Sequence, residues 1–194
     1  MIDEPTRAAV ARATVRVVRL AIGLTFVAGI RRGNPGAVVN AVVAYAGTYL
    51  PRAVEHIWDV EFRPWQRAYA ATAMATHAVG MLGPYDDVWW WDHLTHVHSA
   101  SLLGGLAHVL ARRRDWDPCA TVLRTVVAGG LLWEAVEYAI HLYARRRGFE
   151  PLLVTYGKLD TTLDLCFNAV GALLVVAFGD RLLANLDRSE DVRK

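Results

Sequence analysis

Residues 35–50 read PGAVVNAVVAYAGTYL and contain no charged side chain. A helix at the surface of a soluble protein carries charged and polar residues along the face that meets water, and this stretch offers no such face. A strand of a half-buried sheet would show apolar and polar residues in strict alternation, and the stretch does not follow that pattern either. It therefore predicts a helix surrounded by lipid and by other helices.

The rest of the chain repeats this pattern of charge-poor segments separated by Pro and Gly. A helix that spans a bilayer needs about 20 mostly apolar residues, and frequent Gly and Ala allow such helices to pack closely. We therefore expect an all-α fold, a polytopic membrane helical bundle of about six transmembrane helices that forms a single integral membrane domain over residues 1–194. The expected helices cover approximately residues 13–31, 36–53, 66–83, 93–111, 119–143 and 160–183.

The composition excludes several other classes of protein. With 54% apolar residues and a net charge of only +2, the chain is neither disordered nor a nucleic-acid-binding protein that relies on bulk positive charge, and we expect no nucleic-acid partner. Two cysteines are too few for a disulfide-based fold. A soluble all-α bundle is the remaining alternative. Arginine clusters at the segment ends and the tryptophans at 89–91 favour the membrane, because both are typical of membrane interfaces.

The distribution of Lys and Arg predicts the orientation of the chain in the cell membrane. Most of the 21 Lys and Arg residues fall on one side if six helices cross the bilayer and both termini lie together. Cytoplasmic loops carry the excess of positive charge, so we expect a multi-pass protein of the cell membrane with both termini in the cytoplasm. The six residues that this count places outside are Arg31, Arg32, Arg145, Arg146, Arg147 and Lys158, and the arginine run at 145–147 is the one misfit.

Ionisable side chains within the expected helices gather near one end of several of them. Such groups are expensive in a bilayer and mark functional sites. Adjacent spans run in opposite directions, so the second half of one helix and the first half of the next meet the same leaflet. We therefore expect one polar cavity near the outer leaflet, surrounded by His77, Asp92, His96, Glu134, Glu137, Asp160 and Asp164.

Helical spacing aligns many of these residues. Asp92 and His96 are four residues apart, and Asp160, Asp164 and Asn168 follow one another at the same spacing, which places each set on one helix face. Imidazole nitrogens and carboxylate oxygens are ligands of Zn²⁺, Mn²⁺ and Fe. The predicted ligands of such a divalent metal are Asp92, His96, Glu134, Asp164, His77 and Asp160.

Other interpretations of this cluster stay open. The same carboxylates and imidazoles suit an acid–base network without a metal. Asp92 and Asp160 each suit the role of a helix N-cap. The whole cluster also suits a purely structural role in which polar contacts lock the packing of the helices.

A metal site of this kind predicts a metal-dependent hydrolase or transferase that acts on a lipid or lipid-linked substrate. A bound metal ion polarises a phosphoryl or ester oxygen, Glu137 or His93 would act as the general base, and the arginines at 145–147 would hold an anionic head group. The arginines suit anchoring at the membrane interface equally well. Whether the protein is an enzyme stays open, because a proton- or metal-coupled carrier and a structural or partner-binding membrane protein use the same residue types.

Three motifs resemble those of one family of membrane proteins. They are WDHLTH at residues 91–96, WEAVEY at 133–138 and DTTLDLCFNAVG at 160–171, and the upstream LP at 50–51 and THA at 76–78 also fit. Residues from about 50 to 179 thus resemble the YjdF-type family of bacterial and archaeal integral membrane proteins. The order of the motif residues is more distantly similar to that of VanZ-type proteins. The resemblance implies a polytopic membrane protein but no particular activity, because the function of the family is unknown.

Overall fold

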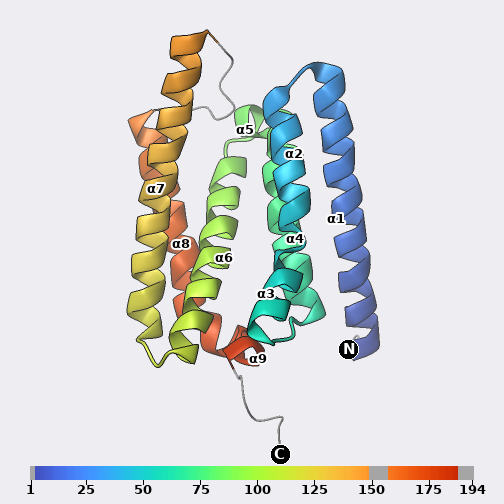
Figure 1. The fold of residues 1–194 in the computed structure, drawn as a ribbon, viewed down its shortest axis with the longest axis vertical. Helices are drawn as coiled ribbons and strands as arrows, with labels where there is room; N and C mark the ends of the chain where they lie inside the picture. Colours follow the sequence, from blue (N-terminus) through green and yellow to red (C-terminus); the bar gives the residue numbers. More distant parts are fainter. Residues whose placement is uncertain (1–2, 149–156, 188–194) are drawn as a thin grey trace, which may run out of the picture. The chain divides into compact units, whose positions relative to one another are not determined.

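The computed structural model describes residues 3–148 and 157–187, and these residues form helices without any strand among them. The long helices are α1 (Glu4–Arg32), α4 (Pro64–Gly80), α6 (Trp91–Arg113), α7 (Pro118–Arg147) and α8 (Lys158–Leu182) (Figure 1). The short ones are α2 (Pro35–Gly47), α3 (Leu50–Trp58), α5 (Pro84–Asp87) and α9 (Ala184–Asp187). The expected all-α fold of a helical membrane bundle is confirmed.

Three helices of the described chain, α1, α7 and α8, are long and apolar enough to cross a bilayer. Each carries large apolar side chains on its outside, such as Leu20 on α1, Leu132 on α7 and Leu173 on α8, all more than half exposed. Removing apolar surface from water lowers the free energy by about 25 cal/mol per Å². These exposed apolar faces therefore suit contact with lipid. With 23 residues, α6 also has the length of a span. The total of six spans stays a prediction.

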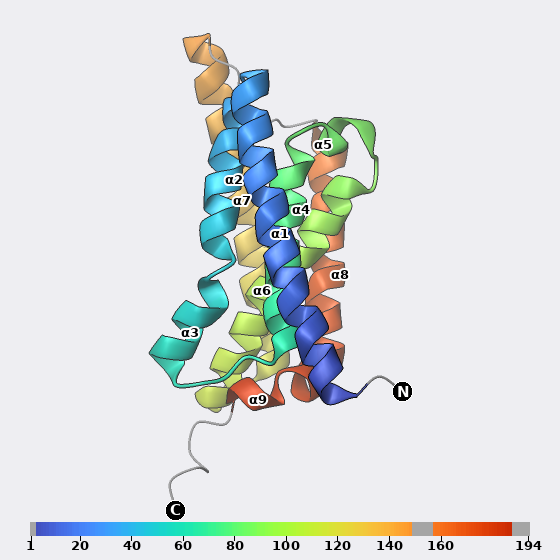
Figure 2. The same cartoon turned by 90° about the vertical axis from the view of Figure 1, so that its right-hand side faces the viewer.

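The second expected helix, residues 36–53, is replaced by two helices. The first of them, α2, ends at Gly47, Thr48 and Tyr49 follow, and then α3 begins. Figure 2 shows that α3 leaves the axis of α2. Pro51 explains the break, because it has no N–H to donate to the carbonyl oxygen of Gly47 four residues earlier. At 13 residues, α2 is too short to span a bilayer alone, which takes about 20.

The first helix starts earlier than expected. It begins at Glu4 rather than near residue 13, because Pro5 suits the first helical turn, where its missing N–H is not needed. An acidic residue at this end also suits the helix dipole. The bounds of α4, α6, α7 and α8 lie within a few residues of those expected.

The contacts between helices divide the chain into two compact units, one up to Trp91 and one comprising Asp92–Asp187. In the first unit α1, α2 and α4 run side by side (Figure 1). Their shared core consists of Ile22, Ala41, Ala44 and Ala78. Because three of these four residues are alanine, the helix backbones approach one another closely, as is common in membrane bundles.

Asn34 fixes the tight turn between α1 and α2. Its Oδ1 accepts a hydrogen bond from the backbone N–H of Ala37 (2.9 Å) and so caps α2. Its Nδ2 donates to the carbonyl oxygen of Met81, just after α4 (3.0 Å). One side chain therefore connects the start of α2 with the end of α4.

Replacing Asn34 by Ala is expected to lower the free energy of unfolding by about 1–2 kcal/mol, because the cap is lost and the Met81 carbonyl group loses this donor. The measurement is equilibrium unfolding of the detergent-solubilised protein. Asn40→Ala is the matched control, because the Nδ2 of Asn40 bonds only the Gly36 carbonyl oxygen within α2 (3.3 Å). An equal loss in the two variants would show that Asn34 has no special role.

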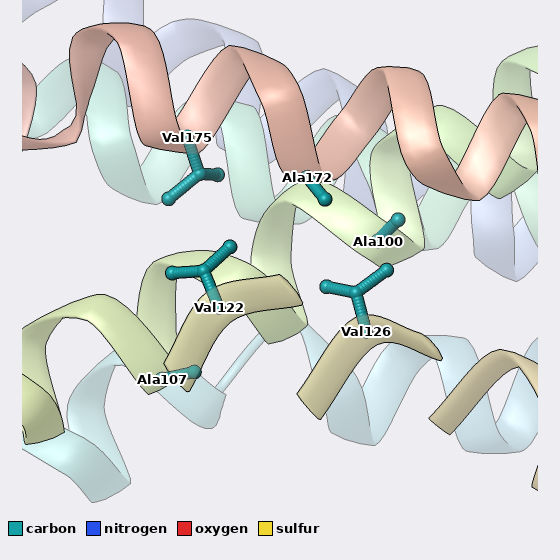
Figure 3. Close-up of a cluster of buried hydrophobic side chains, with 6 residues drawn as sticks. All are labelled: Ala100, Ala107, Val122, Val126, Ala172 and Val175. Atoms are coloured by element: carbon teal, nitrogen blue, oxygen red, sulfur yellow. The ribbon is translucent and has the colours of Figure 1, made fainter. Parts of the chain in front are cut away.

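In the second unit, helices α6, α7 and α8 pack around small side chains. Figure 3 shows them facing one another: Ala100 and Ala107 from α6, Val122 and Val126 from α7, and Ala172 and Val175 from α8. None of them is more than 8% exposed. Small side chains at these positions bring the three helices close together, which places the polar residues one or two turns away within reach of one another.

Gly171 allows α8 to pack closely against α6. A Cβ atom at this position would lie 2.6 Å from the carbonyl oxygen of Val97 and 2.8 Å from the Cβ atom of Ala100, so no side chain fits. Asp164 and Asn168 precede Gly171 by seven and three residues and therefore share its helix face. This close approach directs both of them toward the first turns of α6.

The other end of the contact between α6 and α8 is held by charged groups. The guanidinium group of Arg112 donates hydrogen bonds to Oδ1 of Asp180. The Nε2 atom of His108 lies 3.3 Å from the same oxygen. The two helices are therefore joined by a glycine contact at the middle of α8 and by an ion pair near its C-terminal end.

Candidate functional site

Two residues on one face of α6 begin the candidate site. Asp92 and His96 are separated by one helical turn, and Nε2 of His96 lies 3.7 Å from Oδ1 of Asp92. The hydroxyl group of Thr95 donates to the carbonyl oxygen of Asp92 (2.7 Å), which secures the first turn of the helix. The carboxylate of Asp92 is 28% exposed, so the site is open on this side.

The facing residues come from the first turns of α8. Oδ1 of Asp164 lies 3.5 Å from Nε2 of His96. The other ring nitrogen of His96, Nδ1, lies 3.3 Å from Oδ1 of Asn168. An amide oxygen only accepts hydrogen bonds, so Nδ1 of His96 donates in this contact. Nε2, which faces the two carboxylates, is the ring nitrogen that a proton or a metal ion would occupy.

The distances among these three groups match ligands that share a metal ion. One ligand atom each from Asp92, His96 and Asp164 lie within 4.8 Å of one another. Ligands at about 2.1 Å from a tetrahedral ion are about 3.4 Å apart, close to the 3.5 and 3.7 Å measured from Nε2 of His96. These separations exceed the roughly 2.7–3.2 Å of a good hydrogen bond. The three groups therefore form a possible His/Asp metal site.

Burial makes the Asp164 carboxylate costly to ionise. Asp164 is 4% exposed, and within the described residues its Oδ1 atom makes no hydrogen bond. An ionised carboxylate without a partner is strongly disfavoured in an apolar environment. Either a proton or a cation must therefore neutralise Asp164 in the folded protein.

More acidic groups surround Asp164. The carboxylates of Asp92, Asp160, Glu134 and Glu137 are all near enough to interact with it electrostatically. Glu134 and Glu137 come from the second half of α7, and the buried Oε1 atom of Glu134 has no hydrogen-bond partner in the part of the chain that the structure describes. Several like charges at one place repel one another, which again favours a bound cation.

His93 is held against α8 beside this group. Its imidazole ring stacks on the ring of Phe167, with 4.3 Å between the ring centres and 7° between the planes. Its Nδ1 atom lies 3.9 Å from Oδ1 of Asp164. The stacking holds the imidazole ring of His93 beside the Asp164 carboxylate.

The structure thus places most of the predicted site residues in one unit. Asp92, His93 and His96 from α6 meet Asp164 from α8, with Glu134, Glu137 and Asp160 near Asp164. His77 belongs to the other unit, where its Nδ1 atom lies 3.0 Å from the hydroxyl oxygen of Tyr85, and its role as a ligand stays a prediction. The three arginines predicted to bind substrate are exposed at the end of α7.

Two residues of the site were absent from the predicted set of ligands and bases. Asn168 orients His96, and its spacing of four residues from Asp164 is the signal that marks it in the sequence. Phe167 stacks on His93, and no spacing rule indicates it because the contact joins residues 74 positions apart.

Comparison with known proteins agrees with the membrane assignment. The chain matches a family model described as predicted membrane protein (DUF2238) over residues 14–185. No match was found among curated proteins or among solved structures. The YjdF-type family that the motifs resemble is this same family. Since the model covers most of the chain, the protein belongs to the DUF2238 family of predicted membrane proteins.

Proposed function

We propose that Asp92, His96 and Asp164 bind a divalent metal ion and that the protein is a metal-dependent hydrolase or transferase. The observation that carries the proposal is the ligand-like spacing of 3.5 and 3.7 Å around Nε2 of His96. One imidazole nitrogen and two carboxylates suit Zn²⁺, Mn²⁺ or Fe. Glu134 and Asp160 are further ligands in this proposal, because their carboxylates interact electrostatically with that of Asp164.

Asn168 has a positioning role in this proposal. A ligating histidine commonly donates its second ring N–H to an oxygen, which fixes the tautomer and the ring orientation. The 3.3 Å contact between Nδ1 of His96 and Oδ1 of Asn168 supplies this interaction. It keeps Nε2 available for the metal.

The chemistry follows from the groups around the ion. A metal ion held by Asp92, His96 and Asp164 would supply Lewis-acid activation of a phosphoryl or ester oxygen. His93 or Glu137 would take the proton of the attacking water or hydroxyl group and return it to the oxygen of the leaving group, since both lie near the carboxylates and neither is a ligand in this proposal. A proton acceptor held in place in this way contributes about 10²–10⁴-fold to the rate.

A lipid or lipid-linked substrate suits the surroundings of the site. The helices that carry it expose apolar side chains such as Leu132 and Leu173, which face acyl chains in a bilayer. Arg145, Arg146 and Arg147 lie at the end of α7 that follows Glu134 and Glu137. Their guanidinium groups would hold the anionic head group through charge-assisted hydrogen bonds.

Metal analysis of the detergent-purified protein tests the proposal. We expect about one metal ion per chain, and less than about a tenth of that in the double variant Asp92→Asn/His96→Gln, because two of the proposed ligands, including the imidazole nitrogen, are lost. His98→Gln is the matched control on the same helix and should keep the metal. A metal-free wild-type protein after dialysis against Zn²⁺, Mn²⁺ or Fe²⁺ would instead favour the acid–base or structural interpretation.

A further inference from the structure

Five arginines line one pocket of about 540 Å³ in the first unit, far in sequence from the metal site. They come from three helices. Arg12, Arg16 and Arg19 lie on α1, Arg52 on α3 and Arg67 on α4. A volume of this size is typical of a pocket for a small ligand, about 300–1,000 Å³.

The positive charge of this arginine pocket is only partly neutralised. Arg67 pairs with Glu55, with 2.6 Å between NH2 and Oε1, and Glu61 is the one acidic residue among the described residues that line the pocket. Arg12 and Arg16 form no salt bridge within the described chain and remain exposed. Repulsion among like charges brought together in this way is relieved by a bound anion.

Contacts with the two residues between α2 and α3 hold Arg19 in place on one side of the pocket. Nε of Arg19 donates to the hydroxyl oxygen of Thr48 (3.0 Å), and its guanidinium carbon lies 3.9 Å from the centre of the Tyr49 ring. Thr48 and Tyr49 are the two residues between α2 and α3, so the break caused by Pro51 forms part of the pocket. A guanidinium group held in place in this way loses little freedom when it binds an anion.

We infer that the arginine pocket binds a phosphate-bearing anion, either the head group of a phospholipid or a soluble phosphate compound. Guanidinium groups match phosphate oxygens in pairs, with two parallel hydrogen bonds. Arg12 and Arg16 are one helical turn apart on the same face, so both can reach one phosphate group. Val15 and Phe62 line the same pocket and suit contact with the glycerol and the first carbons of acyl chains.

Binding of defined probes to the full-length protein in detergent tests this inference. The probes are dioctanoyl phosphatidate, inorganic phosphate and, without phosphate, dioctanoylglycerol, followed through intrinsic tryptophan fluorescence and the thermal unfolding midpoint. The test variant is Arg12→Gln/Arg16→Gln. The matched control is Arg7→Gln/Arg31→Gln, which removes the same charge from the same helix but outside the pocket.

We expect phosphatidate to bind the wild-type protein and the control variant alike, and the test variant at least about tenfold more weakly, because charge-assisted hydrogen bonds are lost. Inorganic phosphate binding as tightly as phosphatidate would identify a soluble ligand, and much weaker binding would identify a lipid head group. Equal loss in the test and control variants, or dioctanoylglycerol binding as tightly as phosphatidate, would overturn the inference. If the glutamine variant does not fold, Arg12→Lys/Arg16→Lys replaces it in the test, because it keeps the positive charge and removes only the guanidinium groups. Unchanged phosphatidate binding by this lysine variant would also contradict pairing of phosphate with guanidinium groups.

Discussion

Asp164→Asn is expected to abolish metal binding and, at the same time, to stabilise the metal-free protein. Asparagine keeps the shape of the side chain but removes the negative charge that a divalent ion needs. Loss of an outer residue of a metal site already costs about 10–100-fold in affinity, so loss of this ligand should cost more than about 100-fold. The measurement is competition with a fluorescent chelator.

The gain in stability without metal has a separate cause. Asp164 is 4% exposed and interacts electrostatically with four other carboxylates, so its charge is disfavoured when no cation is present. Neutralising it should raise the free energy of unfolding of the metal-free protein by about 1 kcal/mol or more. A structural role alone would predict the opposite sign, because a stabilising contact would be lost.

Asp180→Asn is the matched control, since it makes the same substitution on the same helix. Asp180 is exposed and accepts hydrogen bonds from Arg112 at the other end of the contact between α6 and α8. We expect this variant to keep full metal affinity and to lose up to about 1 kcal/mol of stability. If both variants lost stability equally and bound metal equally, the Asp164 carboxylate would have no part in metal binding.

Gly171→Ala is expected to destabilise the protein by about 1–3 kcal/mol, although alanine favours helices more than glycine does. The helical preference is worth about 1 kcal/mol, but the added methyl group would lie 2.6 Å from a backbone oxygen of α6. The helices must then move apart, and overpacking of this kind costs about 1–3 kcal/mol. Equilibrium unfolding in detergent measures the loss.

The same displacement should weaken metal binding, because Asp164 and Asn168 lie on the helix face that Gly171 holds against α6. Gly105→Ala is the control within the same unit: its Cβ atom would meet only the Cδ1 atom of Leu183 at 3.5 Å, an ordinary contact. That variant should be as stable as the wild type or slightly more stable. Equal stability and equal metal affinity of the two variants would show that the close approach at Gly171 is not required.

The sequence predicts the helices well where the charge pattern is the only signal needed. The bounds of α4, α6, α7 and α8 follow from charge-poor stretches flanked by Pro, Gly and Arg. The charge pattern does not predict the break at Thr48 and Tyr49, because the uncharged stretch runs through both residues without a change. Pro51 marks the position, and only the direction taken by α3 shows that the chain leaves the helix axis (Figure 2).

Half of the candidate site follows from spacing within single helices. One turn separates Asp92 from His96, and one turn separates Asp164 from Asn168, so each pair shares a face in any α-helix. Periodicity within a helix contains no information about which faces of two helices meet. The contact of His96 with Asp164 and Asn168 joins residues about 70 positions apart and depends on the packing of α6 against α8.

By itself, the sequence determined that this protein is an all-helical membrane protein, which helical faces carry ionisable groups and which ends of the helices are rich in arginine. Charge, hydropathy and helical period are properties of single residues or of short segments, so they follow from the sequence alone. The tertiary structure alone decided that Nε2 of His96 faces two carboxylates and that five arginines share one pocket. The first arrangement arises because Gly171 lets the backbones of α6 and α8 approach, and the second depends on the break between α2 and α3. In both, the fit between helices is a property of the pair rather than of either sequence segment.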